Sequence, residues 1–232
     1  MINKLVLCWL LLIPVAIAQA QTDTLRYEKE KVKHPTTASL IAPAVFTAYG
    51  FAALKWQALK DFDGQVRKRI WTDNPHRLFH LDNYLQLAPG LSVYALNAAG
   101  IHGRHNLRDR TIIFLVSNAI MGATVFSLKK AINARRPDGS GNDGFPSGHT
   151  ALAFAGAEFM AQEFRDVSPW YGVAGYTMAA GTGFLRIYND KHWFSEVASG
   201  AGIGILATKA TYWLFPLIQR KLRLQKRPDY KW

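Results

Sequence analysis

Cysteine is almost absent from this sequence, which excludes one way of holding a fold together. The only cysteine among the 232 residues is Cys8, and an internal disulfide needs two thiols, so a disulfide framework is excluded. The alternation of apolar and polar residues that is typical of half-buried strands is also scarce, and no internal repeat or low-complexity tract is found. These absences leave packed helices as the expected source of structure.

Acidic residues are few relative to basic ones. Asp and Glu number 16 against 28 Lys and Arg, so the formal net charge is +12. Such an excess is typical of proteins with anionic partners. The cations flank apolar segments, and no recognised nucleic-acid-binding module is present. We therefore expect anionic headgroups at a membrane, and no nucleic acid, as partners.

The first twenty residues have the layout of a secretory signal peptide. Lys4 precedes an apolar stretch over residues 5–18, and small residues occupy positions 18 and 20. We expect residues 1–20 to be a signal peptide or an uncleaved signal anchor. Residues 21–232 have the length of a single domain.

Long apolar runs follow the polar stretch at residues 21–37. Each run approaches the ~20 residues that cross a hydrocarbon core, and four of them hold no formal charge, namely residues 36–54, 84–101, 111–128 and 167–185. Two further segments, 150–164 and 197–218, contain Glu158 and Lys209, which buried bundle helices tolerate better than lipid-facing ones. The second segment also holds Gly200 and Gly204, a spacing that favours close helix approach. We expect an all-α, membrane-embedded bundle of about six helices with the active site at helix ends.

Three groups of residues carry the chemistry. They are Lys129 with Arg136 and Pro137; the turn Pro146, Ser147, Gly148 and His149; and Arg186 with His192 and Glu196. A phosphoryl group in transfer spreads negative charge over its oxygens, and arginine matches phosphate geometry. Lys129, Arg136 and Arg186 are therefore candidate phosphate ligands. Taken alone, the first two also fit a charged flank that anchors an apolar run at a membrane interface.

The two histidines have complementary candidate roles. Imidazole has the unperturbed side-chain pKa nearest neutrality, so one ring can attack phosphorus while the other protonates the leaving oxygen. Ser147 is a candidate helix N-cap whose neighbouring amides face an anion, and Gly148 lets the backbone approach closely. Glu196 lies four residues after His192, on the same helix face, where its carboxylate can fix the tautomer of the ring.

Together these motifs resemble those of the type 2 phosphatidic acid phosphatase superfamily, which includes bacterial acid phosphatases and vanadium haloperoxidases. The family pattern is Lys, six residues, Arg-Pro; then Pro-Ser-Gly-His; then Ser-Arg, five residues, His, three residues, Asp. This chain departs from it at Leu185 and Glu196, which replace the serine and the aspartate. The resemblance implies that His192 is the nucleophile that becomes phosphohistidine and that His149 is the general acid. It implies phosphate ligands at Lys129, Arg136, Ser147, Gly148 and Arg186.

Asp138, Asp143 and Asp190 lie near the histidines in the sequence and raise the alternative of a metal site. Residues 138–144 lack the ligand spacing of a calcium loop, and their composition favours a flexible loop. We therefore expect neither a metal nor another cofactor.

The resemblance implies metal-independent hydrolysis of a phosphomonoester or pyrophosphate on a membrane lipid. Lipid A, undecaprenyl pyrophosphate, phosphatidylglycerol phosphate and phosphatidic acid are the candidate substrates. The alternative is a non-catalytic membrane protein that binds or moves phosphorylated lipids through the same pocket. A soluble acid phosphatase or a haloperoxidase is less favoured, because neither needs glycine-rich spans. The oligomeric state is not predicted.

Charge asymmetry predicts the orientation. The basic tail at residues 220–227 is expected in the cytoplasm, which places the motif loops on the periplasmic side of a bacterial inner membrane. If the signal peptide is cleaved, the mature N-terminus begins outside the cytoplasm. A segment 36–54 that crosses the membrane completely would then reverse the predicted orientation of all later segments. Either that segment lies on the membrane or re-enters it, or residues 1–20 are retained. Residues 55–77 favour the first alternative, because their Lys, Arg, Trp and Phe content is typical of an interfacial stretch.

Overall fold

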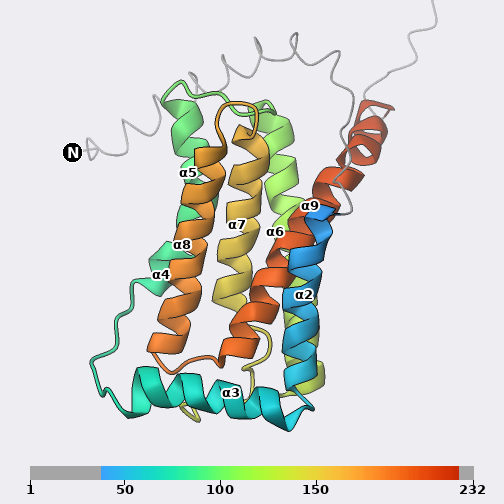
Figure 1. Ribbon diagram of the computed structural model, residues 1–232. Coiled ribbons are helices and arrows are strands. Elements are labelled where there is room, and N and C mark those ends of the chain that lie inside the picture. The colour runs from blue at the N-terminus through green and yellow to red at the C-terminus, as the bar shows by residue number, and fades with distance from the viewer. Residues whose placement is uncertain (1–37, 225–232) are drawn as a thin grey trace, which may run out of the picture.

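The computed structural model describes residues 38–224, and over that range the chain contains helices and no strand (Figure 1). The elements are α2 (Ala38–Ala53), α3 (Gln57–Arg67), the π-helical η2 (Lys68–Thr72), α4 (Asp82–Leu85), α5 (Ala88–Ala98), α6 (Leu107–Ile132), α7 (Gly148–Phe164), α8 (Pro169–Tyr188) and α9 (Phe194–Leu224). The predicted all-α class is confirmed for this part of the chain. The expected signal peptide at residues 1–20 and the end of the basic tail lie outside the described residues.

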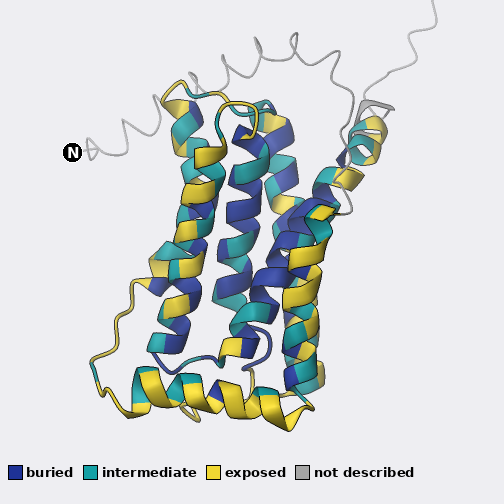
Figure 2. Ribbon diagram, viewed as in Figure 1, coloured by how far each residue is buried: buried dark blue, intermediate teal, exposed yellow. Residues whose placement is uncertain are grey.

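The helix α7 forms the centre of the bundle. It packs against α5, α6, α8 and α9, while α2 packs on α9. Figure 2 shows that α7 is buried along most of its length, as expected for a helix at the centre of a bundle. The helix α3 lies across one end of this bundle (Figure 1).

Glycines let α9 approach α7 closely. A Cβ atom on Gly200 would lie 2.5 Å from the carbonyl oxygen of Ser147, and one on Gly204 would overlap the carbonyl oxygen of Ala151. Because no side chain fits at either position, the backbone of α9 rests directly on the backbone of α7. The close approach predicted for this glycine pair is confirmed.

Two of the described helices, α6 over Leu107–Ile132 and α9 over Phe194–Lys221, are long and apolar enough to cross a membrane. The helix α2 passes the same test only when it is paired with the segment Gln57–Thr72, and the pair bends by 98° at the break between them. Such a bend is that of a broken span or a re-entrant loop. It fits the expectation that residues 36–54 do not form a simple span.

The apolar run at residues 84–101 does not form one long helix, contrary to what its length favoured. It divides between the end of α4 and α5, and α5 is only 11 residues long. Pro89 lies in the first turn of α5, where a missing N–H is tolerated. In the interior of a continuous helix, its ring would clash with the carbonyl group four residues earlier. The expected span is therefore interrupted.

Local signals end the long helices where the motif loops begin. The helix α6 ends at Asn133, whose left-handed backbone (φ 51°, ψ 44°) turns the chain shortly after Lys129, and asparagine tolerates this conformation. The helix α7 begins after Ser147, and α9 begins two residues after His192. The carboxyl ends of α6 and α8 therefore meet the amino ends of α7 and α9 at one end of the bundle.

Charged residues inside the bundle are paired, either between two helices or between a helix and a loop. Lys209 of α9 lies 2.7 Å from Glu158 of α7, which also accepts a hydrogen bond from Tyr176 of α8. Glu163 of α7 lies 2.7 Å from the ring of His105. Glu158 and Lys209 are both buried, which confirms that they belong to the interior of the bundle.

Candidate active site

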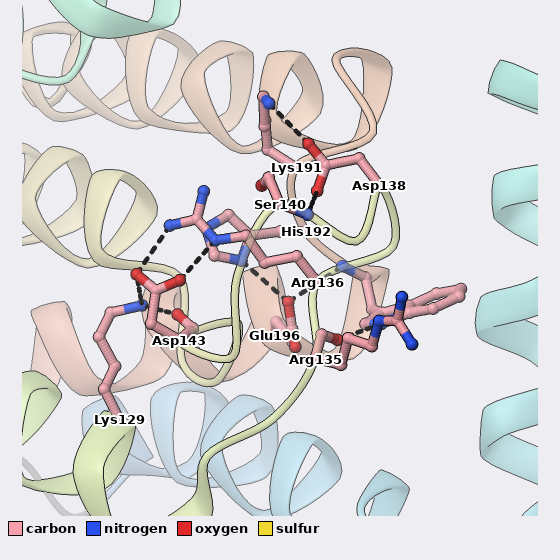
Figure 3. A network of polar contacts seen from close by, with 10 residues as sticks. Lys129, Arg135, Arg136, Asp138, Ser140, Asp143, Lys191, His192 and Glu196 are labelled. Carbon is pink, nitrogen blue, oxygen red and sulfur yellow. Dashed lines mark hydrogen bonds and ion pairs between the residues drawn. The ribbon is translucent and has the colours of Figure 1, made fainter.

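Lys129, Arg136, His192 and Glu196 lie together where the loop between α6 and α7 meets the loop between α8 and α9 (Figure 3). His192 is close enough to Arg186, Lys129, Arg136 and His149 for the charge of each to act on its ring. The spacing of the motifs in the sequence thus corresponds to proximity in space.

His192 and Glu196 form a buried pair. His192 Nδ1 lies 2.8 Å from Glu196 Oε2, and the backbone N–H of Trp193 donates to the same oxygen at 3.2 Å. Because Nδ1 is held, Nε2 is the ring nitrogen left to react. Burial lowers the pKa of His192 well below its usual range, and the charges of Arg186 and Lys129 act in the same direction. The ring is therefore neutral at neutral pH and its Nε2 lone pair is available.

The longer carboxylate at position 196 fits because a glycine faces it. A Cβ atom on Gly144 would lie 2.5 Å from Glu196 Oε1 and 3.1 Å from the carbonyl oxygen of Ala134. The backbone N–H of Ser147 donates to the Glu196 carbonyl at 3.1 Å, which ties the start of α7 to the start of α9. The departure from the family's aspartate at this position is thus accommodated by the opposite loop.

Arg136 and Lys129 converge on one carboxylate. Arg136 donates from Nε and Nη2 to the two oxygens of Asp143, at 2.8 and 2.9 Å, and Lys129 Nζ donates to the carbonyl group of the same residue (Figure 3). The hydrogen bonds from Arg136 hold the pKa of Asp143 below its usual range. A half-exposed anion therefore lies between two of the cations that are predicted to bind phosphate.

Arg186 binds a carboxylate that the motifs do not contain. Its Nη1 lies 2.5 Å from Oδ2 of Asp82, the first residue of α4, and both side chains are buried. Asn189 donates to the other oxygen of Asp82 at 3.3 Å. Asp82 is separated from Arg186 by 104 positions, and no sequence spacing connects the two. Sequence reasoning therefore missed it.

His149, the last residue of the Pro-Ser-Gly-His motif, also contacts α4. Its Nε2 lies 3.0 Å from Oδ1 of Asn83. Burial lowers the pKa of His149 to about 4, and the charge of Arg186 acts in the same direction. Its low pKa makes this ring neutral at neutral pH, and the negative charge of a bound phosphate would raise that pKa.

Ser147 has the predicted position but not the predicted bond. It lies at the N-cap of α7 with an extended backbone, yet its side chain does not cap a backbone N–H. Its hydroxyl instead pairs with Thr150 Oγ1 at 2.9 Å. A Cβ atom on Gly148 would lie 3.9 Å from Lys129 Cε, so the amino end of α7 lies beside this cation. The amides there remain candidates for binding an anion.

The helix α3 supports the loop that carries His192. Asp63 accepts hydrogen bonds from the backbone N–H and the hydroxyl of Ser195, at 3.0 and 2.5 Å. Arg67 donates two hydrogen bonds of 2.7 Å to Asp190, whose backbone has a positive φ of 55°. The composition of residues 55–77 predicted an interfacial stretch, and it gave no sign of these contacts.

The fold and the site define the class of this protein: a helical bundle with apolar spans and a cation-rich histidine site at one end. The family model of the PAP2 superfamily matches residues 110–220, a range that contains all three motifs. These residues belong to the PAP2 superfamily, which confirms the resemblance inferred from the motifs.

A curated relative adds detail. The lipid A 1-phosphatase of Porphyromonas gingivalis is 41% identical over 159 residues, a match that covers 68% of this chain and 36% of the relative. The chain thus matches about a third of the length of that relative.

Two solved structures are similar in fold. The first, a transmembrane PAP2-type phosphatidylglycerolphosphate phosphatase from Bacillus subtilis, has a TM-score of 0.50 and 18% identity, covering 83% of this chain and 98% of that one. The second, LpxE of Aquifex aeolicus, has a TM-score of 0.43 and 18% identity, covering 74% and 94%. The first shows the shared fold. Together with the family match, the apolar spans of α6 and α9 place the protein in a membrane.

Proposed function

We propose that this protein is a membrane phosphatase that removes phosphate from a phosphorylated lipid by way of a phosphohistidine. The observation that carries the proposal is the buried pair of His192 and Glu196, held beside three cations and a second histidine. A neutral, oriented imidazole next to fixed positive charge is suited to attack on a phosphoryl group.

The proposed reaction has two steps. His192 Nε2 forms a bond to phosphorus while the bond from phosphorus to the lipid oxygen breaks, and His149 gives its proton to that oxygen. A water molecule then gives a proton to His149 and attacks phosphorus, so that phosphate leaves and His192 is regenerated. Glu196 stabilises the cationic ring of His192, and Arg136, Lys129 and Arg186 stabilise the equatorial oxygens.

Lipid A that carries a phosphate at its 1-position is the substrate that we favour. The relative from Porphyromonas gingivalis, a lipid A 1-phosphatase, supports this choice. The charge asymmetry of the chain supports an inner-membrane location with the site on the periplasmic side. Undecaprenyl pyrophosphate, phosphatidylglycerol phosphate and phosphatidic acid are the comparison substrates.

Phosphate release from these four lipids by detergent-purified protein tests the proposal. We expect His192→Ala to lower turnover more than about a thousandfold, because the nucleophile cannot be bypassed. His102→Ala, an exposed histidine in the loop before α6, is the matched control. Acid quenching should trap labelled phosphate on His192. Lipid binding without turnover would instead support a protein that binds or moves phosphorylated lipids.

A further inference from the structure

The short helix α4 contacts the second histidine of the site, although it contains none of the three motifs. Asn83 Oδ1 lies 3.0 Å from His149 Nε2. Asn83 is exposed, so its side chain is not held there by burial. Its contact with the imidazole therefore needs an explanation other than core packing.

Neighbouring residues fix the position of α4. Asp82, immediately before Asn83, is fully buried and binds both Arg186 and Asn189. Asn189 also binds the segment that precedes α4. Its side-chain amide accepts a hydrogen bond from the backbone N–H of Phe79 at 2.8 Å and donates one to the carbonyl of the same residue at 2.9 Å. The backbone that presents Asn83 is thus attached to the carboxyl end of α8, which holds its side chain beside His149.

We propose that Asn83 is a positioning residue for His149 in the phosphatase reaction, on which this inference rests. Its amide oxygen accepts the proton on His149 Nε2, which assigns Nδ1 to the exchange of protons with the substrate. Asn83 thus does for His149 what Glu196 does for His192, without adding a negative charge.

The proton balance follows from this assignment. Protonated His149 holds one proton on each ring nitrogen. It gives the Nδ1 proton to the leaving oxygen in the first step and keeps the Nε2 proton on Asn83. In the second step, Nδ1 accepts a proton from the attacking water. Asn83 is neither protonated nor deprotonated at any stage.

A neutral partner suits the charges that surround His149. The ring experiences Arg186 from α8, Asp82 from α4, Lys129 from α6 and Arg136 from the following loop, and it acts in turn on His192. A carboxylate at position 83 would favour the charged imidazole and raise its pKa, typically by one or more units. An amide at position 83 orients the ring without a charge of its own, so that the pKa of His149 is set by the other charged groups and by the bound phosphate.

The experiment compares two substrates that differ in their leaving group, p-nitrophenyl phosphate and a lipid alkyl phosphate. A good leaving oxygen needs little protonation, whereas an alkoxide depends on it. We expect Asn83→Ala to lower kcat about tenfold on the lipid phosphate and less than about twofold on p-nitrophenyl phosphate. The tenfold loss is a part of the rate enhancement of about 10²–10⁴ that general acid catalysis typically supplies. KM should change little on either.

Two further variants complete the test. Asn83→Asp should keep turnover on the lipid and move the descending limb of its kcat profile to higher pH. Gln86→Ala is the matched control, because Gln86 lies beside α4 and its side chain donates to the backbone carbonyl of Asn83. Equal losses on both substrates, the same loss in Gln86→Ala, or an unshifted Asn83→Asp profile would each overturn the inference. Failure of the unmodified protein to hydrolyse either substrate would instead reject the proposed function itself.

Discussion

At the scale of single residues, Asp143 occupies the place where an anion is expected to bind. Its carboxylate accepts two hydrogen bonds from Arg136, and Lys129 lies 3.9 Å from one of its oxygens. A substrate phosphate and this carboxylate cannot both use the donors of Arg136 fully. Asp143 thus partly neutralises these cations, and we expect it to compete with oxyanions for them.

Removing this charge should tighten the binding of oxyanions. We expect Asp143→Asn to lower the dissociation constants of phosphate and vanadate by no more than about fivefold, because half-exposed ion pairs contribute about 1 kcal/mol or less. Titration calorimetry measures both constants. The control is Asp138→Asn, since Asp138 pairs with Lys191 at 2.6 Å and does not bind these cations. Weaker oxyanion binding in Asp143→Asn would show that Asp143 positions Arg136 instead of competing for it.

The sequence predicted the site residues that lie in the three motifs, and it missed the residues outside the motifs that hold them in place. Residues of one motif lie within a few positions of each other, so their spacing is visible in the chain. Arg67 and Asp190, by contrast, lie 123 positions apart in the sequence, and Asp82 and Arg186 lie 104 positions apart. A short motif does not record pairs that are so far apart. The composition of residues 138–144 indicated a flexible loop for Asp143, and the sequence did not pair this residue with Arg136. Contacts of this kind depend on how the helices pack, which spacing alone does not specify.

At the scale of helices, the pairing of Glu158 with Lys209 joins α7 to α9 inside the bundle. Removing one member leaves the other buried and unpaired, which typically costs about 3–5 kcal/mol, whereas replacing both can be nearly neutral. We therefore expect Lys209→Met to lower the melting temperature in detergent strongly. The double variant with Glu158→Gln should recover most of the loss.

The exposed Lys221→Met serves as the control for removing a lysine from α9. It should leave the melting temperature nearly unchanged. If the losses from Glu158→Gln and Lys209→Met simply add in the double variant, the two side chains do not stabilise the bundle as a pair.

Helix boundaries were partly predictable. Apolar runs correctly indicated α6 and α8, and the glycine pair correctly indicated the contact of α9 with α7. The run at residues 84–101 wrongly indicated one long helix, because hydropathy does not take account of Pro89 or of the ion pair between Asp82 and Arg186. The run looks continuous in composition but is interrupted in its backbone.

At the scale of the whole molecule, orientation in the membrane is the property that remains a prediction. In a chain with Cys8→Ser, a cysteine introduced as Ser140→Cys lies in the exposed loop after α6, on the side of the site. We expect it to react with an impermeant thiol reagent once the outer membrane is permeabilised. The matched variant His102→Cys, in the loop before α6, should react only after the inner membrane is opened.

The opposite labelling pattern would place the site in the cytoplasm and direct the search to lipids of the inner leaflet. A reporter fused after Trp232 gives an independent reading and is expected on the cytoplasmic side. Sequence reasoning reached the all-helical class and the gathering of the motifs at one end. It did not distinguish spanning helices from helices that are merely apolar, because both bury the same residue types.

The glycine contact between α7 and α9 has a consequence for how selectivity and chemistry are divided in this molecule. His149 follows the N-cap of α7 and His192 precedes α9, and these two helices meet backbone to backbone at Gly200 and Gly204. The separation of the two rings is therefore set by the main chain and not by interchangeable side chains. Residues on the outer faces of α2, α5 and α8 can therefore change, and with them the proposed lipid specificity, while the distance between the two histidines stays the same.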